Sequence, residues 1–166
     1  QNISLNNQSN FQFTKTSLSL ANENITCQAW ADFNMDGRID VVVGGANFLK
    51  LFQQTATGFK LQIDSTGVNV ISVAVGDFNK DGRIDFVASG TQDLKPFTTL
   101  YKNSNSFKFK KIRIAKPISG VINTGDFNHD GYFDIMVNGK NYNSSDRIDF
   151  YRNKVDNFLQ IGRAHV

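Results

Sequence analysis

Short apolar runs, each preceded by a polar loop, recur three times along the chain. The runs occupy residues 41–43, 86–88 and 135–137, and each is closed by a nearby glycine. Runs of this length that are rich in β-branched residues and end at glycine predict buried strands and not helices. An alternating segment at 71–75 predicts the strand that enters the second loop. The pattern therefore indicates an all-β protein.

Two more strands are predicted after each apolar run. The third strand ends in a polar turn, and the fourth strand carries a phenylalanine. The third strands are expected at 51–53, 100–103 and 150–153, and the fourth strands are expected to carry Phe59, Phe107 and Phe158. Four strands in about 45 to 50 residues, repeated, are typical of propeller blades. We predict a partial β-propeller of about three four-stranded antiparallel blades, with units at about 17–63, 64–113 and 114–160.

One extra strand is predicted before the first unit. Phe11 and Phe13 resemble the fourth strand of the other units, so residues 10–16 are expected to be the last strand of a preceding blade. Three blades and one strand cannot close a ring of four to eight blades. We therefore expect the remaining blades in a longer chain. Residues 161–166, IGRAHV, resemble a reading frame of a sequencing-adapter oligonucleotide and are expected to be a non-native tail.

The three polar loops share one spacing of oxygen-bearing side chains, DxNxDGxxD. They begin at Asp32, Asp77 and Asp126, which are 45 and then 49 residues apart. Three carboxylates held close together repel one another, so the pattern predicts a divalent cation in each loop. Glycine at position 6 is expected to take a positive φ, and position 7 is expected to contribute its backbone carbonyl. The predicted metal ligands are Asp32, Asn34, Asp36, Arg38, Asp40, Asp77, Asn79, Asp81, Arg83, Asp85, Asp126, Asn128, Asp130, Tyr132 and Asp134.

The predicted ion is Ca²⁺, with up to three sites, because every donor is an oxygen and the shell is flexible. An EF-hand would need Glu at position 12, where this chain has Val43, Ala88 and Val137. Solvated polar turns without an ion are the alternative, since Asp, Asn and Gly are ordinary turn residues. Three copies in register favour the cation sites.

These units resemble the FG-GAP and VCBS repeats of the integrin α-subunit type of β-propeller. The resemblance rests on the motif GDFNxDGxxD followed by an apolar strand, and on a later hydrophobic-Tyr-x-Asn strand. Residues 76–87 and 125–137 match almost throughout, and 31–43 matches with Ala in place of the leading Gly. The Phe-Gly and Gly-Ala-Pro landmarks of the family are degenerate, so an integrin-like chain and a bacterial-style repeat protein both remain open. The resemblance implies Ca²⁺ bound on one face of the propeller.

The charge distribution is uneven, although the net charge is only +3. Nine of the fifteen acidic residues lie in the three loops, and the clearest basic cluster consists of Lys108, Lys110, Lys111, Arg113 and Lys116. Such a cluster can bind nucleic acid, but lysines alternating along a strand are more typical of a solvated face or a guarded sheet edge. We expect no nucleic-acid partner. The chain has no apolar run of membrane-spanning length, so we expect no membrane insertion by this segment.

The residues do not support an enzyme. Cys27 is the only cysteine and is expected to be buried, while His129 is expected to be a solvated loop residue and His165 lies in the suspected tail. No Ser/His/Asp or Cys/His site can be assembled from them.

The predicted function is a calcium-binding module of an extracellular or cell-surface adhesion or ligand-binding protein, with an unknown protein or glycan ligand. Extracellular oxygen-only sites have dissociation constants of about 10⁻⁴ to 10⁻³ M, which suits the calcium outside cells. Glycosylation sequons at Asn2, Asn7, Asn24 and Asn143 indicate the same location. The alternatives are an accessory propeller of a secreted enzyme and a calcium-dependent lectin.

Overall fold

The computed structural model describes residues 3–6, 10–13, 18, 20, 23–114, 117–154 and 158–164. The regular structure of these residues consists of strands, as the sequence predicts. The strands are β1 (Ile3–Asn6), β2 (Asn10–Phe13), β3 (Ile25–Ala31), β4 (Asp40–Gly45), β5 (Phe48–Thr55), β6 (Gly58–Thr66), β7 (Val68–Gly76), β8 (Asp85–Gln92), β9 (Lys95–Asn105), β10 (Lys108–Arg113), β11 (Ser119–Gly125), β12 (Asp134–Lys140), β13 (Asp146–Asn153) and β14 (Phe158–Ala164).

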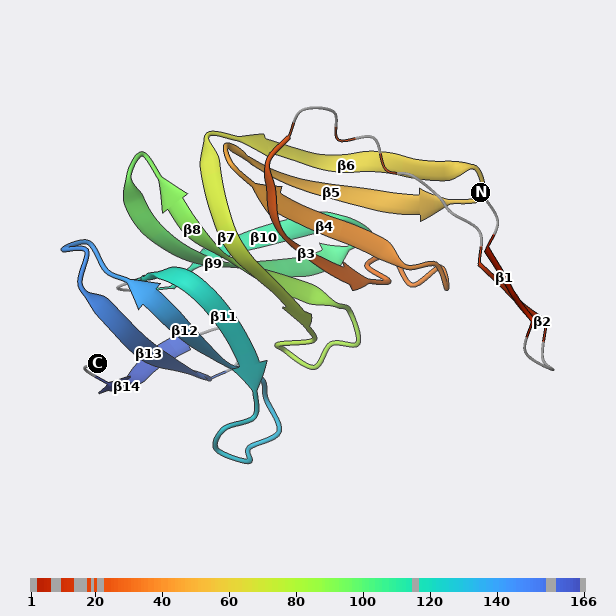
Figure 1. The fold of residues 1–166 in the computed structure, drawn as a ribbon. Helices are drawn as coiled ribbons and strands as arrows, with labels where there is room; N and C mark the ends of the chain where they lie inside the picture. The colour runs from red at the N-terminus through yellow and green to blue at the C-terminus, as the bar shows by residue number, and fades with distance from the viewer. Residues whose placement is uncertain are drawn as a thin grey trace.

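Twelve of these strands form three antiparallel sheets of four, each ordered as the chain runs (Figure 1). The sheets are β3 to β6, β7 to β10 and β11 to β14, and β1 pairs with β2 separately. This arrangement confirms the all-β prediction of a partial propeller with about three four-stranded blades. The strand expected at 10–16 is present as β2, with β1 as a partner that was not predicted, and residues 14–16 lie outside the described residues.

The first strand of each sheet lies nearest the neighbouring sheet. β7 contacts both β3 and β11, and β6 and β14 lie at the outer margins (Figure 1). Side chains also join these inner strands, since the Ser72 hydroxyl of β7 accepts a hydrogen bond from the backbone N–H of Ile122 in β11, at 3.1 Å. The sheets are therefore joined along their inner strands, as blades are in a propeller.

The apolar core lies in layers between adjacent sheets. Phe33, Phe86 and Phe97 belong to the layer between the first two sheets, and Phe78 and Ile135 belong to the layer between the second and third. β4 and β8 each separate two core clusters, and both are largely buried along their length. This burial on both faces explains why these strands are apolar without alternation.

Several details of the sequence prediction need adjustment. The first sheet extends to Thr66, beyond the expected unit limit at residue 63. Phe107 lies in the turn between β9 and β10 with a φ of 68°, so the fourth strand of the second sheet begins after it. The backbone of 161–164 continues β14, and the non-native origin of 161–166 stays a prediction. Cys27 is half-buried, and burial raises the pKa of its thiol.

No helix among the described residues is long and apolar enough to cross a bilayer.

Candidate metal centres in three equivalent loops

The three acidic loops occupy the same place in each sheet. They connect β3 to β4, β7 to β8 and β11 to β12, and all three emerge on the same side of the molecule (Figure 1). Position 1 of each loop follows the inner strand, and position 9 is the first residue of the next strand. The repeat in sequence is therefore a repeat in space.

The aspartate at position 1 closes each loop through backbone N–H groups. One carboxylate oxygen of Asp32, Asp77 or Asp126 accepts the N–H of position 5, at 3.1 Å in every loop. The other oxygen accepts the N–H of the glycine at position 6, at 2.7, 2.8 and 2.7 Å. Short polar side chains commonly bond their own backbone in this way, so this aspartate shapes the turn.

Two positions of each loop have left-handed backbone. The glycine at position 6 has φ values of 82°, 82° and 85°, which confirms the predicted positive φ. Position 4 is also left-handed, with φ values of 61° at Met35, 58° at Lys80 and 59° at His129. Met and Lys have no preference for this region, whereas His is enriched in it, so the residue types at position 4 do not by themselves predict this conformation in all three loops.

The aspartate at position 9 ties each loop to the third strand of its sheet. Asp40, Asp85 and Asp134 are buried, with relative exposures of 0%, 0% and 1%. One oxygen accepts the N–H of position 2 at 3.0 to 3.1 Å. The other accepts an N–H of β5, β9 or β13 at 2.8 Å. The position-9 carboxylate thus links the loop with two elements of the blade.

Burial shifts the acidity of two of these carboxyl groups. Loss of solvent raises the pKa of Asp40 and raises the pKa of Asp85 to about 6. The N–H donors from the third strand and from position 2 oppose the shift, and the nearby carboxylates at positions 1 and 5 add to it.

The aspartate at position 5 is paired with an arginine in every loop. Asp36 contacts Arg38 at 2.7 Å, Asp81 contacts Arg83 at 2.5 Å, and Asp130 contacts Arg152 at 3.3 Å. Its second oxygen accepts the backbone N–H of position 7 at 2.9 to 3.0 Å. The sequence predicts only a backbone carbonyl from position 7. In the first two loops the arginine side chain at that position also balances the charge of position 5, and in the third loop Arg152 of β13 does so.

Residues Asn34, Asn79 and Asn128 provide the amide oxygens at position 3. The Asn79 Oδ1 is buried and accepts no hydrogen bond from the described residues, whereas the Asn34 and Asn128 oxygens accept the N–H of position 5. A buried oxygen without a donor suits a hard cation, as does a donor set composed of oxygen. In the part of the chain that the structure describes, no group of three or more His, Cys, Asp or Glu side chains is gathered around a metal position. The assignment of the fifteen ligands stays a prediction.

The sequence from the first to the second loop has a known family relationship. Residues 32–88 match the model of the FG-GAP-like repeat, from position 1 of the first loop into β8. This segment is similar to the FG-GAP-like repeat. The match confirms the resemblance stated from the sequence, and a search of curated proteins gave no match for the chain.

Two asparagines connect the acidic loops of neighbouring blades. The Asn103 amide donates to Phe33 O of the first loop at 2.7 Å and to Ile84 O of the second at 3.2 Å. Asn153 repeats the bridge, donating to Phe78 O of the second loop at 2.6 Å and to Phe133 O of the third at 3.1 Å. Each asparagine ends the hydrophobic-Tyr-x-Asn segment of its third strand, and that spacing is the sequence signal that could have identified it.

The second and third loops also contact each other directly. The Lys80 amine lies over the Tyr132 ring, 4.3 Å from its centre. Phe78 and Phe133 meet edge to face, with ring centres 6.3 Å apart. The loops are therefore fixed relative to one another as well as to their own sheets.

Proposed function

We propose that the chain is a calcium-binding FG-GAP-type propeller module that acts by binding a ligand outside the cell, in an adhesion or ligand-binding protein, and not by catalysis. The observation that carries this proposal is the threefold repetition of one oxygen-rich loop on the same side of the sheets. The FG-GAP-like match over 32–88, which covers two of these loops, supports it.

In this proposal each loop would hold one Ca²⁺ through the side-chain oxygens at positions 1, 3, 5 and 9 and the carbonyl at position 7. The ion would supply a double positive charge that offsets the carboxylates. The chain itself orients these groups, because backbone N–H donors fix the aspartates at positions 1 and 9. Arg38, Arg83 and Arg152 would compete with the ion for the position-5 carboxylates.

An extracellular location is part of the same proposal. Calcium sites of extracellular modules have dissociation constants of about 10⁻⁴ to 10⁻³ M, so they fill outside cells and remain empty in the cytosol. The sequons at Asn24 and Asn143 lie on exposed residues, which is compatible with glycosylation, and Asn2 and Asn7 lie outside the described residues.

Thermal unfolding in CaCl₂, MgCl₂ and EDTA tests the calcium part of the proposal. Calcium at ten times the dissociation constant should add about 1.4 kcal/mol to the free energy of unfolding for each occupied site. We expect a higher Tm in calcium than in magnesium or EDTA. Asp81→Ala should reduce the calcium-induced increase by about a third, since it would impair one of three sites.

The matched control is Asp146→Ala, which removes an exposed carboxylate outside the loops. It should leave the calcium-induced increase unchanged. Equal Tm values in calcium, magnesium and EDTA would overturn the calcium assignment.

A further inference from the structure

A cleft of about 410 Å³ lies between the first and second sheets. Its walls come from the end of β6 and the start of β7 on one side and from β8, β9 and β10 on the other. The ends of β6 and β8 lie away from the acidic loops, which precede β4 and β8. This volume is within the range of pockets that hold small molecules, about 300 to 1,000 Å³.

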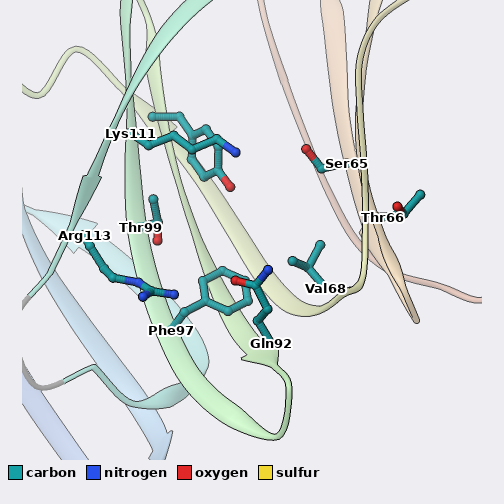
Figure 2. A pocket seen from close by; sticks show the side chains of 9 residues that line it. Ser65, Thr66, Val68, Gln92, Phe97, Thr99, Lys111 and Arg113 are labelled. Carbon is teal, nitrogen blue, oxygen red and sulfur yellow. The ribbon is translucent and has the colours of Figure 1, made fainter.

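Two cationic side chains of β10 line the cleft. Lys111 and Arg113 are two residues apart in a strand, so they share one face, and Figure 2 shows both directed into the space. Phe109, on the same face, packs against Phe33 and Phe86 between the sheets, with ring centres 5.9 and 5.1 Å apart. The face of β10 that carries these cations is therefore held against the first sheet.

Neither cation has an acidic partner among the described residues. Lys111 contacts only the ring of Tyr101, with its amine 5.4 Å from the ring centre, and Arg113 makes no hydrogen bond or ion pair there. The described residues that line the cleft include no Asp or Glu. Two positive charges on one wall of a cleft attract an anion, and guanidinium groups pair with carboxylates and sulfates through two parallel hydrogen bonds.

The remaining polar groups of the cleft are hydroxyls and an amide. Ser65 contributes a hydroxyl from β6, with Thr66 at the margin of the cleft, Thr99 contributes a hydroxyl from β9, and Gln92 contributes its amide from the end of β8 (Figure 2). The buried rings of Phe97 and Tyr101 add an apolar surface. A few polar groups on a partly apolar wall match the alternating hydroxyl and C–H surface of a sugar ring.

We propose that this cleft binds an acidic sugar, a saccharide that carries a carboxylate or a sulfate, with Lys111 and Arg113 holding the anionic group. This inference assigns a ligand class to the proposed module and so rests in part on it. The cleft is separate from the acidic loops, so binding of the sugar does not require calcium.

Titration of the ¹⁵N-labelled full chain, followed by NMR, tests the inference. The probes are sodium glucuronate and glucose 6-sulfate, with neutral glucose as the control, at a constant ionic strength of about 0.15 M. We expect saturable shifts at lining residues with at least one acidic sugar, in EDTA and in CaCl₂ alike. Comparing the two probes shows whether the cleft accepts the carboxylate or the sulfate.

The double variant Lys111→Gln, Arg113→Gln should weaken binding by about tenfold or more, because it removes both charged donors. The matched control is Lys110→Gln, which removes one charge from the other face of the same strand and should change the affinity by less than about twofold. All three side chains are exposed, so these variants should fold.

The inference would be overturned if neither acidic sugar gave saturable shifts or if neutral glucose bound equally well. An unchanged affinity in the double variant would also overturn it. So would binding of a glutamate-rich peptide in the cleft when neither sugar binds. A chain that binds an acidic sugar but shows no response to calcium would support the cleft and refute the calcium sites, so the two proposals fail separately.

Discussion

At the residue scale, the loop positions with local causes could be predicted from the sequence. Asp, Asn, Asp and Gly at fixed spacing indicated the turn and the positive φ at position 6, because both depend on neighbouring residues. The role of Asp85 could not be predicted, since its carboxylate accepts an N–H from Asn103, eighteen residues away. The loops close with N–H donors and arginines around the carboxylates, so an ion is not the sole source of compensation for their charge.

The raised pKa of Asp85 predicts how stability in EDTA should depend on pH. Its folded-state pKa of about 6 exceeds the value of about 3.9 expected in an unfolded chain. Between these values the folded protein binds more protons, so the free energy of unfolding should fall as pH rises from about 4 to 6.5, by at most about 3 kcal/mol from this group.

Urea unfolding across this pH range measures the effect, and Asp85→Asn is the comparison that isolates it. The variant loses an acceptor for the Phe78 N–H and should be less stable, but this carboxyl no longer titrates. The difference in stability between the two proteins should shrink as pH rises. A difference that grows with pH would show that the pKa of Asp85 is lowered in the folded protein.

At the scale of elements, the local pattern of apolar residues predicts which segments are buried strands. It does not predict which strands of neighbouring blades contact each other. The runs at 41–43 and 86–88 were identified as buried strands because their apolar residues occupy both faces, and each separates two core layers. The sequence predicts Phe107 in a fourth strand, but the two-residue turn between β9 and β10 includes it. The position of a turn depends on strand register, and the hydrophobic pattern alone does not determine that register to within one residue.

The inter-blade bridge of Asn103 gives a prediction at this scale. Asn103→Ala would leave the buried Phe33 O and the partly buried Ile84 O without this amide donor. A lost donor in a buried site costs about 1 to 3 kcal/mol, so the free energy of unfolding should fall by that amount.

The control is Gln54→Ala, at the corresponding position of the first sheet. Its N–H bonds Asp40 as that of Asn103 bonds Asp85, but its side chain bonds only the exposed N–H of Ile39. Chemical denaturation should show less than about 1 kcal/mol for this change. Equal losses in the two variants would mean that the bridge between blades contributes nothing of its own.

At the scale of the whole molecule, the sequence predicted repeated blades because the repeat is periodic, and the sheets follow it in chain order. The cleft between the first two sheets was not predicted. Lys111 and Arg113 were assigned to a solvated or edge face, and β10 is the edge of its sheet. Lys111 and Arg113 lie beside β6 because of the way the second blade packs on the first. This packing cannot be predicted from the sequence pattern.

We propose that the three equivalent loops each hold one calcium ion. Calorimetric titration of the full chain with CaCl₂ measures the number of sites directly. We expect a stoichiometry of about three for the natural loops and about two for Asp81→Ala, because each loop carries its own set of ligands. Two results would contradict the calcium assignment. One is no heat of binding together with no calcium-induced increase in Tm, and the other is an unchanged stoichiometry in Asp81→Ala.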